Sequence, residues 1–257
     1  MGLVDLEIGM KKSEDHGAAQ IRPPVWYQGA PIHFDSAWPR WLKLSVALLI
    51  FALSFLIDHT AAVWAFHTHL HLKSDIKLEM TMLGQYGQWT CSILVILAVG
   101  LLDKQGRKKA LAIALGCLAT VLVCYLLKGM FGRTRPWAYH NGDWSFMGPA
   151  YGFSNAKYQS FPSAHTTGSF ALSAGLSWFY PRGRALFYAL ALDVAFQRVL
   201  EHAHFPSDTI AGMILAVVIV RSVLYYGVPG KVIHALPLNW QKWYLTANVD
   251  VPTEAAR

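Results

Sequence analysis

The sequence RVLEHAHFPSD, residues 198–208, lies between two apolar runs, each long enough to cross or nearly cross a membrane. It holds an arginine, two histidines, a glutamate and an aspartate within eleven positions. Charged side chains so close to a bilayer core are costly, so they indicate a functional site. Arg198, His204 and Asp208 suit phosphate chemistry, as a cationic clamp, a nucleophile and a carboxylate that orients it. The alternative is a short interfacial loop whose charges meet water.

The composition indicates a membrane protein. The chain has 257 residues, of which 54% are hydrophobic and 14% charged, and its mean hydropathy is +0.31. A soluble domain carries about 25% charged residues. The net charge is +7, but the basic residues are spread over short loops without a basic helix or recognition motif, so we expect no nucleic-acid partner. Cys91, Cys117 and Cys124 fall in apolar runs and are expected to be buried thiols.

Six apolar segments are predicted to cross the membrane as an all-α bundle, because a spanning helix needs roughly 20 apolar residues. They cover about residues 38–66, 84–102, 110–127, 164–180, 185–203 and 208–227. Residues 38–228 are therefore expected to form one transmembrane domain. Residues 1–37 lack the apolar core of a signal peptide and are interpreted as a polar cytoplasmic tail. Residues 229–257 are interpreted as a second cytoplasmic tail.

Two connecting segments have their own character. Residues 67–82 are more polar and contain the alternating histidines His67, His69 and His71. No acidic or cysteine ligand accompanies them, so an interfacial loop or amphipathic helix is favoured over a metal site. Residues 129–161 are rich in Gly, Pro, Asn, Trp and Tyr, which is typical of a structured loop.

The distribution of basic residues predicts the orientation of the bundle. With six spans both termini lie on one side, and fifteen of the 22 Lys and Arg residues fall on the segments of that side. The positive-inside rule therefore predicts that both termini are cytoplasmic. The polar ends of the third to sixth spans then meet at the opposite, non-cytoplasmic face. This topology brings Lys128, His165 and His204, which are distant in sequence, to one site.

The segment that follows the third span and the segment that opens the fourth span both suit anion binding. Three cations, Lys128, Arg133 and Arg135, fall within eight residues, and arginine binds phosphate oxygens bidentately while lysine supplies a point charge. A solvated basic loop is the alternative. Ser163 is expected to cap the following helix, whose free N–H groups bind anions. Capping alone, with His165 as an interfacial histidine, is the alternative here.

In the third segment, Asp208 is placed to accept a hydrogen bond from one ring nitrogen of His204. The other ring nitrogen would then be unprotonated and aimed at an electrophile, which is the arrangement of a catalytic triad. Glu201 and His202 lie nearby, but we assign them no chemical role.

These segments resemble the signature of the type 2 phosphatidic acid phosphatase superfamily, which is K-x6-R-P, then P-S-G-H, then S-R-x5-H-x3-D. The matching residues are Lys128, Arg135 and Pro136; Pro162, Ser163, Ala164 and His165; and Gln197, Arg198, His204 and Asp208. Order and spacing are retained, with alanine in place of the glycine and glutamine in place of the leading serine. Alanine keeps the backbone N–H, although a positive φ would cost it roughly 1–2 kcal/mol.

The resemblance implies a role for each matching residue. His204 attacks phosphorus and forms a phosphohistidine, Asp208 orients its ring, and His165 protonates the leaving group. The phosphate oxygens are held by cationic and polar groups, namely Lys128, Arg135, Arg198, Ser163 and Ala164. No metal or other cofactor is then needed, because fixed cations supply the electrostatic stabilisation.

The expected function is hydrolysis of a lipid phosphomonoester or diphosphate by an integral membrane protein. We expect it in the bacterial inner membrane, with the site facing the periplasm or exterior. A phosphotransferase that passes the phosphoryl group to another lipid or sugar would use the same residues. A transporter or a non-catalytic protein that binds anionic lipid is a candidate from a different class. Asp193, inside the fifth span, would suit transport, or it pairs with Ser or Thr at a helix contact.

Overall fold

The structure, a computed structural model, describes residues 39–71, 73–138 and 146–245. Within these ranges the regular elements are all helical, which confirms the predicted all-α class. The helices are α1 (Arg40–His71), α2 (Ser74–Gly84), α3 (Trp89–Leu102), α4 (Gly106–Phe131), α5 (Pro149–Gly152), α6 (Ala164–Phe179), α7 (Arg184–Leu200), α8 (Pro206–Tyr225), α9 (Val228–Ala235) and α10 (Leu238–Leu245). Short 3-10 turns are η2 (Gln85–Gly87), η3 (Pro136–Ala138), η4 (Ala156–Tyr158) and η5 (Pro181–Gly183).

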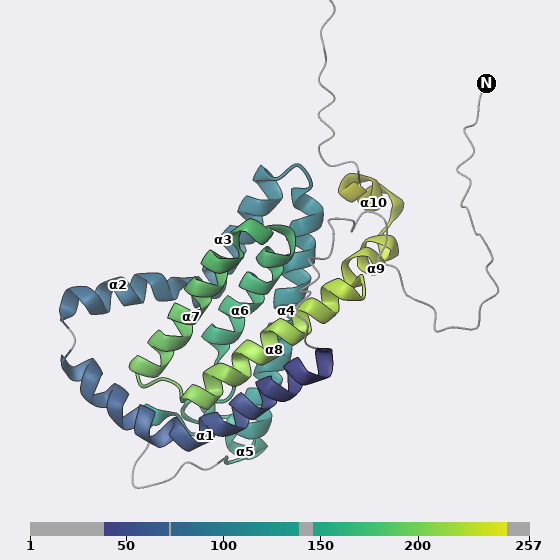
Figure 1. Ribbon diagram of the computed structural model, residues 1–257. Coiled ribbons are helices and arrows are strands. Elements are labelled where there is room, and N and C mark those ends of the chain that lie inside the picture. The colour runs from purple at the N-terminus through teal and green to yellow at the C-terminus, as the bar shows by residue number, and fades with distance from the viewer. Residues whose placement is uncertain (1–38, 72, 139–145, 246–257) are drawn as a thin grey trace, which may run out of the picture.

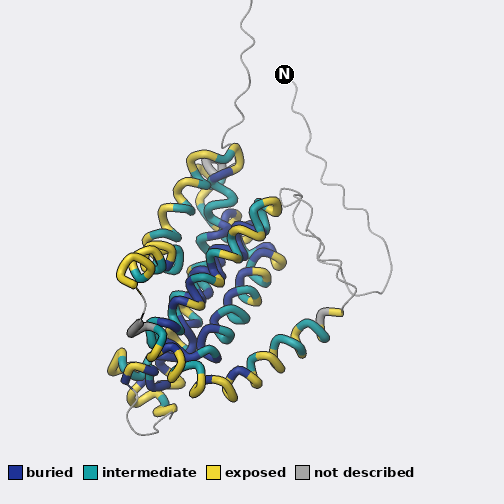
Figure 2. Tube along the Cα trace, turned by 60° about the vertical axis from the view of Figure 1, so that its left-hand side comes forward, coloured by how far each residue is buried: buried dark blue, intermediate teal, exposed yellow. Residues whose placement is uncertain are grey.

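Helix α6 forms the centre of the bundle and packs against α4, α7 and α8 (Figure 1). Eleven of its 16 residues are buried, and most of these are Ala, Ser, Thr or Gly. Small residues let membrane helices approach closely. A Cβ on Gly175 would lie 3.1 Å from Ile113 of α4, and a Cβ on Gly212 of α8 would lie 2.7 Å from Thr167. Figure 2 shows the resulting buried interior in dark blue, inside helices whose outer faces are exposed.

Three helices are long and apolar enough to cross a membrane: Trp41–Thr68 in α1, α4 and α8. Segments Ser74–Gly87 and Trp89–Leu102 pass the same test only as a pair, bent by 59°, which gives up to four spans. Large apolar side chains on the outer faces are exposed, as lipid contact requires; Leu56 of α1 is 77% exposed. The chain is therefore an integral membrane protein.

The predicted spans and the helices agree in position, with differences at their ends. Six helices, α1, α3, α4, α6, α7 and α8, fall at the six predicted segments. Helices α6 and α7 have only 16 and 17 residues, however, so a count of six spans stays a prediction. The second predicted span is interrupted at Gln85–Gly87, and the predicted loop or helix at 67–82 is mostly helical, as α1 and then α2. The side chains of His69 and His71, and residues 1–38, lie outside the described part of the chain.

Two further differences concern the end of the third predicted span and the segment after the sixth. Helix α4 runs on through Lys128 to Phe131 and ends at Gly132, whose φ of +60° is a left-handed conformation that glycine adopts without strain. The predicted C-terminal tail contains the helices α9 and α10 up to Leu245.

The bundle has two distinct ends. At one end the C-terminus of α4, the N-terminus of α6, the C-terminus of α7 and the N-terminus of α8 converge, and α1 lies across α8 (Figure 1). At the other end the α3–α4 turn is fastened to the end of α6. There the Asp103 carboxylate accepts hydrogen bonds from Lys109 Nζ (2.7 Å) and the Tyr180 hydroxyl (3.0 Å). The polar segments singled out in the sequence all belong to the first end.

Candidate active site

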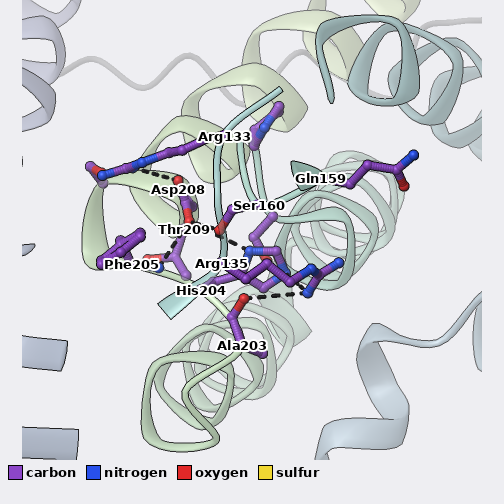
Figure 3. Close-up of polar contacts among 12 residues, drawn as sticks. Arg133, Arg135, Gln159, Ser160, Ala203, His204, Phe205, Asp208 and Thr209 are labelled. Atoms are coloured by element: carbon purple, nitrogen blue, oxygen red, sulfur yellow. Dashed lines mark hydrogen bonds and ion pairs between the residues drawn. The ribbon is translucent and has the colours of Figure 1, made fainter. Parts of the chain in front are cut away.

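His204 lies in the turn between α7 and α8, and its side chain is buried (Figure 3). Its Nδ1 atom is 3.6 Å from Asp208 Oδ2, and its Nε2 atom is 3.4 Å from Arg135 Nη1. The first distance is longer than a hydrogen bond, so Nδ1 faces the carboxylate without the predicted hydrogen bond. One ring nitrogen therefore faces a carboxylate and the other faces a cation.

The surroundings of His204 favour its neutral form. Burial lowers the pKa of His204 to about 3; the charges of Lys128 and Arg135 also lower it, and Asp208 opposes them. A ring nitrogen is nucleophilic only when it is unprotonated. At physiological pH the imidazole is therefore in the state that nucleophilic attack requires.

Asp208 is fixed on all sides. Its side chain is fully buried in the first turn of α8. Oδ1 accepts a hydrogen bond from Arg133 Nη1 (2.6 Å), and Oδ2 accepts from Ser160 Oγ (2.6 Å) and from the backbone N–H of Phe205 (2.9 Å). These bonds leave the carboxylate little freedom to rotate away from His204.

Three cations approach the same site from different elements. From α4, buried Lys128 donates a hydrogen bond to Gln159 O. Arg135, in the loop after α4, donates through Nε to Ala156 O (3.0 Å) and through Nη1 to Ala203 O (3.3 Å). Arg198, in the last turn of α7, acts electrostatically on His165 together with the other two. The structure thus brings together Lys128, Arg135 and Arg198, three of the four cations that the sequence selected.

The start of α6 completes the site. Ser163 is fully buried at the N-cap position, but its side chain makes no capping hydrogen bond, so the predicted capping role is wrong. Its hydroxyl instead accepts from Thr166 Oγ1 (3.1 Å), and its N–H donates to Asp208 O (3.0 Å). Among the described residues only His202 has a positive φ without being glycine, so Ala164 replaces the family's glycine without strain. His165 follows on the first turn, half-buried.

Glu201, which the sequence analysis left without a role, holds Arg198. Its Oε2 lies 2.7 Å from Arg198 Nη2, and its Oε1 accepts a hydrogen bond from Gln197 Nε2 (2.9 Å). Gln197 itself is buried against Gly84 of α2, where any Cβ would overlap its side chain. The glutamine at the position of the signature's leading serine therefore braces Arg198 through Glu201. The i, i+4 spacing of Gln197 and Glu201 on a helix was the signal for this contact.

Arg133 does not join the other cations, contrary to the prediction of a three-cation cluster. Its side chain is 2% exposed and is shared between Asp208 and Asp58 of α1, at 2.6 and 2.7 Å. Asp58, Ser160 and Ser207 were also not selected from the sequence. A carboxylate inside an apolar run was the available signal for Asp58.

Two other predictions concern residues away from this site. Asp193, for which transport or pairing with Ser or Thr was considered, is half-buried on α7, and its Oδ2 has no hydrogen-bond partner among the described residues. Cys124 is buried, while Cys91 and Cys117 are partly buried free thiols. Within the described residues no group of three or more His, Cys, Asp or Glu side chains is arranged to hold a metal ion.

The fold and the site define a class, that of helical membrane proteins with a buried imidazole–carboxylate pair beside several cations. Residues 109–230 match the model of the PAP2 superfamily. The stretch contains all three signature segments, so the resemblance seen in the sequence is confirmed.

The chain is similar to named bacterial enzymes over part of its length. It is 42% identical over 93 residues to lipid A 1-phosphatase of Rhizobium etli, covering 36% of this chain and 39% of that enzyme. It is 26% identical over 159 residues to undecaprenyl-diphosphatase BcrC of Bacillus subtilis, covering 60% of this chain and 77% of that enzyme. The match thus spans about two fifths of the Rhizobium enzyme.

Two solved structures are similar at a coarser level. LpxE of Aquifex aeolicus matches with a TM-score of 0.47 and 20% identity, covering 68% of this chain and 94% of that one. A phosphatidylglycerolphosphate phosphatase of Bacillus subtilis matches with a TM-score of 0.49 and 18% identity, covering 76% of this chain and 98% of that one.

Proposed function

We propose that the protein is an integral-membrane phosphatase that hydrolyses a phosphomonoester or diphosphate on a lipid. The observation that carries the proposal is the orientation of His204, with Nδ1 toward Asp208 and Nε2 beside Arg135. The names of two partial relatives, a lipid A 1-phosphatase and an undecaprenyl-diphosphatase, support a lipid phosphate as the substrate class. The membrane-spanning helices support a substrate that lies in the bilayer.

The reaction proceeds in two steps. In the first, neutral Nε2 of His204 attacks phosphorus, the bond from phosphorus to the leaving oxygen breaks, and His165 gives a proton to that oxygen. In the second, His165 takes a proton from water, the water oxygen attacks the phosphohistidine, and the N–P bond breaks to release phosphate. Asp208 keeps the ring of His204 oriented and stabilises the positive charge that develops on it.

Fixed cations and donors carry the electrostatic part of the reaction. Lys128, Arg135 and Arg198 neutralise the phosphate oxygens, assisted by Ser163 and the N–H of Ala164 at the start of α6. Because protein cations do this, the reaction needs no metal ion. Removal of metals by a chelator is therefore expected to leave the activity unchanged.

We place the site at the non-cytoplasmic face, facing the periplasm or exterior of a bacterial inner membrane. In this proposal residues 38–228 form a six-span domain, with residues 1–37 and 229–257 as cytoplasmic tails. The support is the distribution of basic residues, fifteen of 22 on the cytoplasmic segments. A phosphotransferase would use the same residues, and turnover of labelled lipid phosphate with and without candidate acceptors separates the two activities.

The test uses the purified full chain in detergent, with dioctanoyl phosphatidic acid as substrate. We expect phosphate release that vanadate inhibits and that EDTA does not reduce. His204→Ala should lower kcat by at least about 10³-fold, since it removes the nucleophile. His234→Ala, at an exposed histidine of α9, is the matched control and should retain wild-type activity. Full activity of His204→Ala, or loss of activity with EDTA, contradicts the proposal.

A further inference from the structure

Helix α1 contributes one carboxylate, that of Asp58, to the back of the site. Asp58 lies in the long apolar helix and is 1% exposed. Its Oδ1 accepts a hydrogen bond from the backbone N–H of Ser207 (3.0 Å), and its Oδ2 accepts from Arg133 Nη2 (2.7 Å) and from the Ser207 hydroxyl. A buried carboxylate is costly unless it is paired and hydrogen-bonded, and this one is both.

Arg133 joins Asp58 to Asp208. One terminal nitrogen of its guanidinium donates to Asp58, and the other donates to Asp208 Oδ1 and to the Ser207 hydroxyl, both at 2.6 Å. Aromatic rings enclose the guanidinium, with its carbon 4.3 Å from the centre of Phe205 and 5.3 Å from that of Phe55. Two buried carboxylates thus share one buried cation.

A series of contacts connects His204 with Asp58. Asp208 lies beside His204, and Arg133 bridges Asp208 and Asp58 (Figure 3 shows Arg133, Asp208 and His204). Asp58 also binds the first turn of α8 through the Ser207 N–H, and this turn carries Asp208. Asp58 is therefore linked to Asp208 in two ways, through Arg133 and through the backbone of this turn.

We infer that Asp58 is a positioning residue for the proposed phosphatase reaction, acting on His204 through Arg133 and Asp208. Asp58 lies outside the family match, which begins at residue 109. Without the negative charge of Asp58, Arg133 would interact with the carboxylate of Asp208 alone. Asp208 would then stabilise the positive charge that develops on His204 less well. This inference rests on the proposed function and names a residue that its signature does not contain.

The decisive variant is Asp58→Asn, which keeps the shape and removes the charge. Single-turnover measurements with enzyme in excess over ³²P-labelled dioctanoyl phosphatidic acid give a rate constant that does not depend on the fraction of folded protein. We expect this constant to fall about 10- to 100-fold, as for outer partners that orient a reactive group. Ser54→Ala is the matched control, since Ser54 is buried one turn earlier on α1 and its hydroxyl donates to Phe51 O of the same helix.

Two further variants separate positioning from loss of folding. Ser207→Ala keeps all three charges and removes the hydroxyl between Asp58 and Arg133, and we expect a fall of a few-fold in the same constant. The double variant Asp58→Asn, Arg133→Met should be no slower than Arg133→Met alone, because both act through one path.

The outcomes distinguish the inference from the proposed function. A wild-type protein without phosphatase activity overturns both. An active wild type whose single-turnover constant is unchanged by Asp58→Asn or by Ser207→Ala overturns only the role of Asp58. Multiplying losses in the double variant also overturn it, because they mean that Asp58 and Arg133 act independently.

Discussion

At the scale of single residues, the buried neutral His204 links folding to pH. A histidine of the unfolded chain titrates near 6.5, whereas the pKa of folded His204 is about 3. Below pH 6.5 the unfolded chain therefore binds a proton that the folded protein does not bind. By linkage, the free energy of unfolding falls as the pH falls from about 6.5 toward 3.

We expect this effect in thermal unfolding of the protein in detergent. The midpoint temperature should drop between pH 7 and pH 5, and His204→Gln, which cannot take up the proton, should reduce that drop. His234→Gln, at an exposed position, should follow the wild type. Identical pH dependence for wild type and His204→Gln would show that His204 is not buried in its neutral form.

Sequence spacing predicted which residues gather at the site but not how they are paired. The ends of the predicted spans brought Lys128, His165 and His204 to one face, because helix direction alone decides that. The sharing of Arg133 by Asp58 and Asp208 depends on how α1 lies across α8, and no local pattern encodes that contact.

At the scale of elements, α5 is docked on the end of α4 through two glycines. A Cβ on Gly152 would lie 2.1 Å from Gly129 O and 2.8 Å from Lys128 O, and both contacts are with backbone that cannot rotate aside. This close approach holds the loop between α4 and α6 against the turn of α4 that carries Lys128. Any side chain at residue 152 must therefore displace one of the two helices.

Gly152→Ala is accordingly expected to lower phosphatase activity at least about 10-fold and to reduce the midpoint of thermal unfolding, since overpacking costs roughly 1–3 kcal/mol. Gly100→Ala, in α3, serves as the control, because its Cβ would meet Ala110 at an ordinary 3.5 Å. Equal activity and unfolding temperature for the two variants would mean that α5 does not need this close contact.

The break between α2 and α3 shows why the ends of elements were predicted less well. Hydropathy alone indicated one continuous span across Gly84 and Gly87. In the structure, Gly84 packs on the Gln197 side chain and Gly87 lies against the backbone of His165, where a Cβ would be 3.1 Å from His165 O. Packing against α6 and α7 thus accounts for the position of the bend, and packing is not visible in an apolar pattern.

At the scale of the whole molecule, the proposed orientation separates the two ends of the bundle by the membrane. The α3–α4 turn with Lys104 would face the cytoplasm, and η3 with Trp137 would face the other side. Both side chains are exposed. A cysteine at either position is therefore accessible from one side only.

We expect Trp137→Cys, in a chain whose three native cysteines are replaced by alanine, to react with a membrane-impermeant maleimide on right-side-out spheroplasts. Lys104→Cys should react only after the membrane is opened. Labelling of Lys104→Cys alone in sealed spheroplasts would reverse the proposed orientation. The all-α class and the positions of the helices followed from apolar segments, whereas this orientation depends on charge counts alone.

The shared guanidinium of Arg133 also constrains how this sequence can diverge. Asp58, Arg133 and Asp208 together carry one net negative charge in a buried, aromatic-lined space, and an unpaired member would cost about 3–5 kcal/mol. A single substitution at residue 58 or 133 is therefore hard to accept, whereas a paired change is not. Among natural relatives we expect the residues at these two positions to covary, although 75 positions of chain separate them.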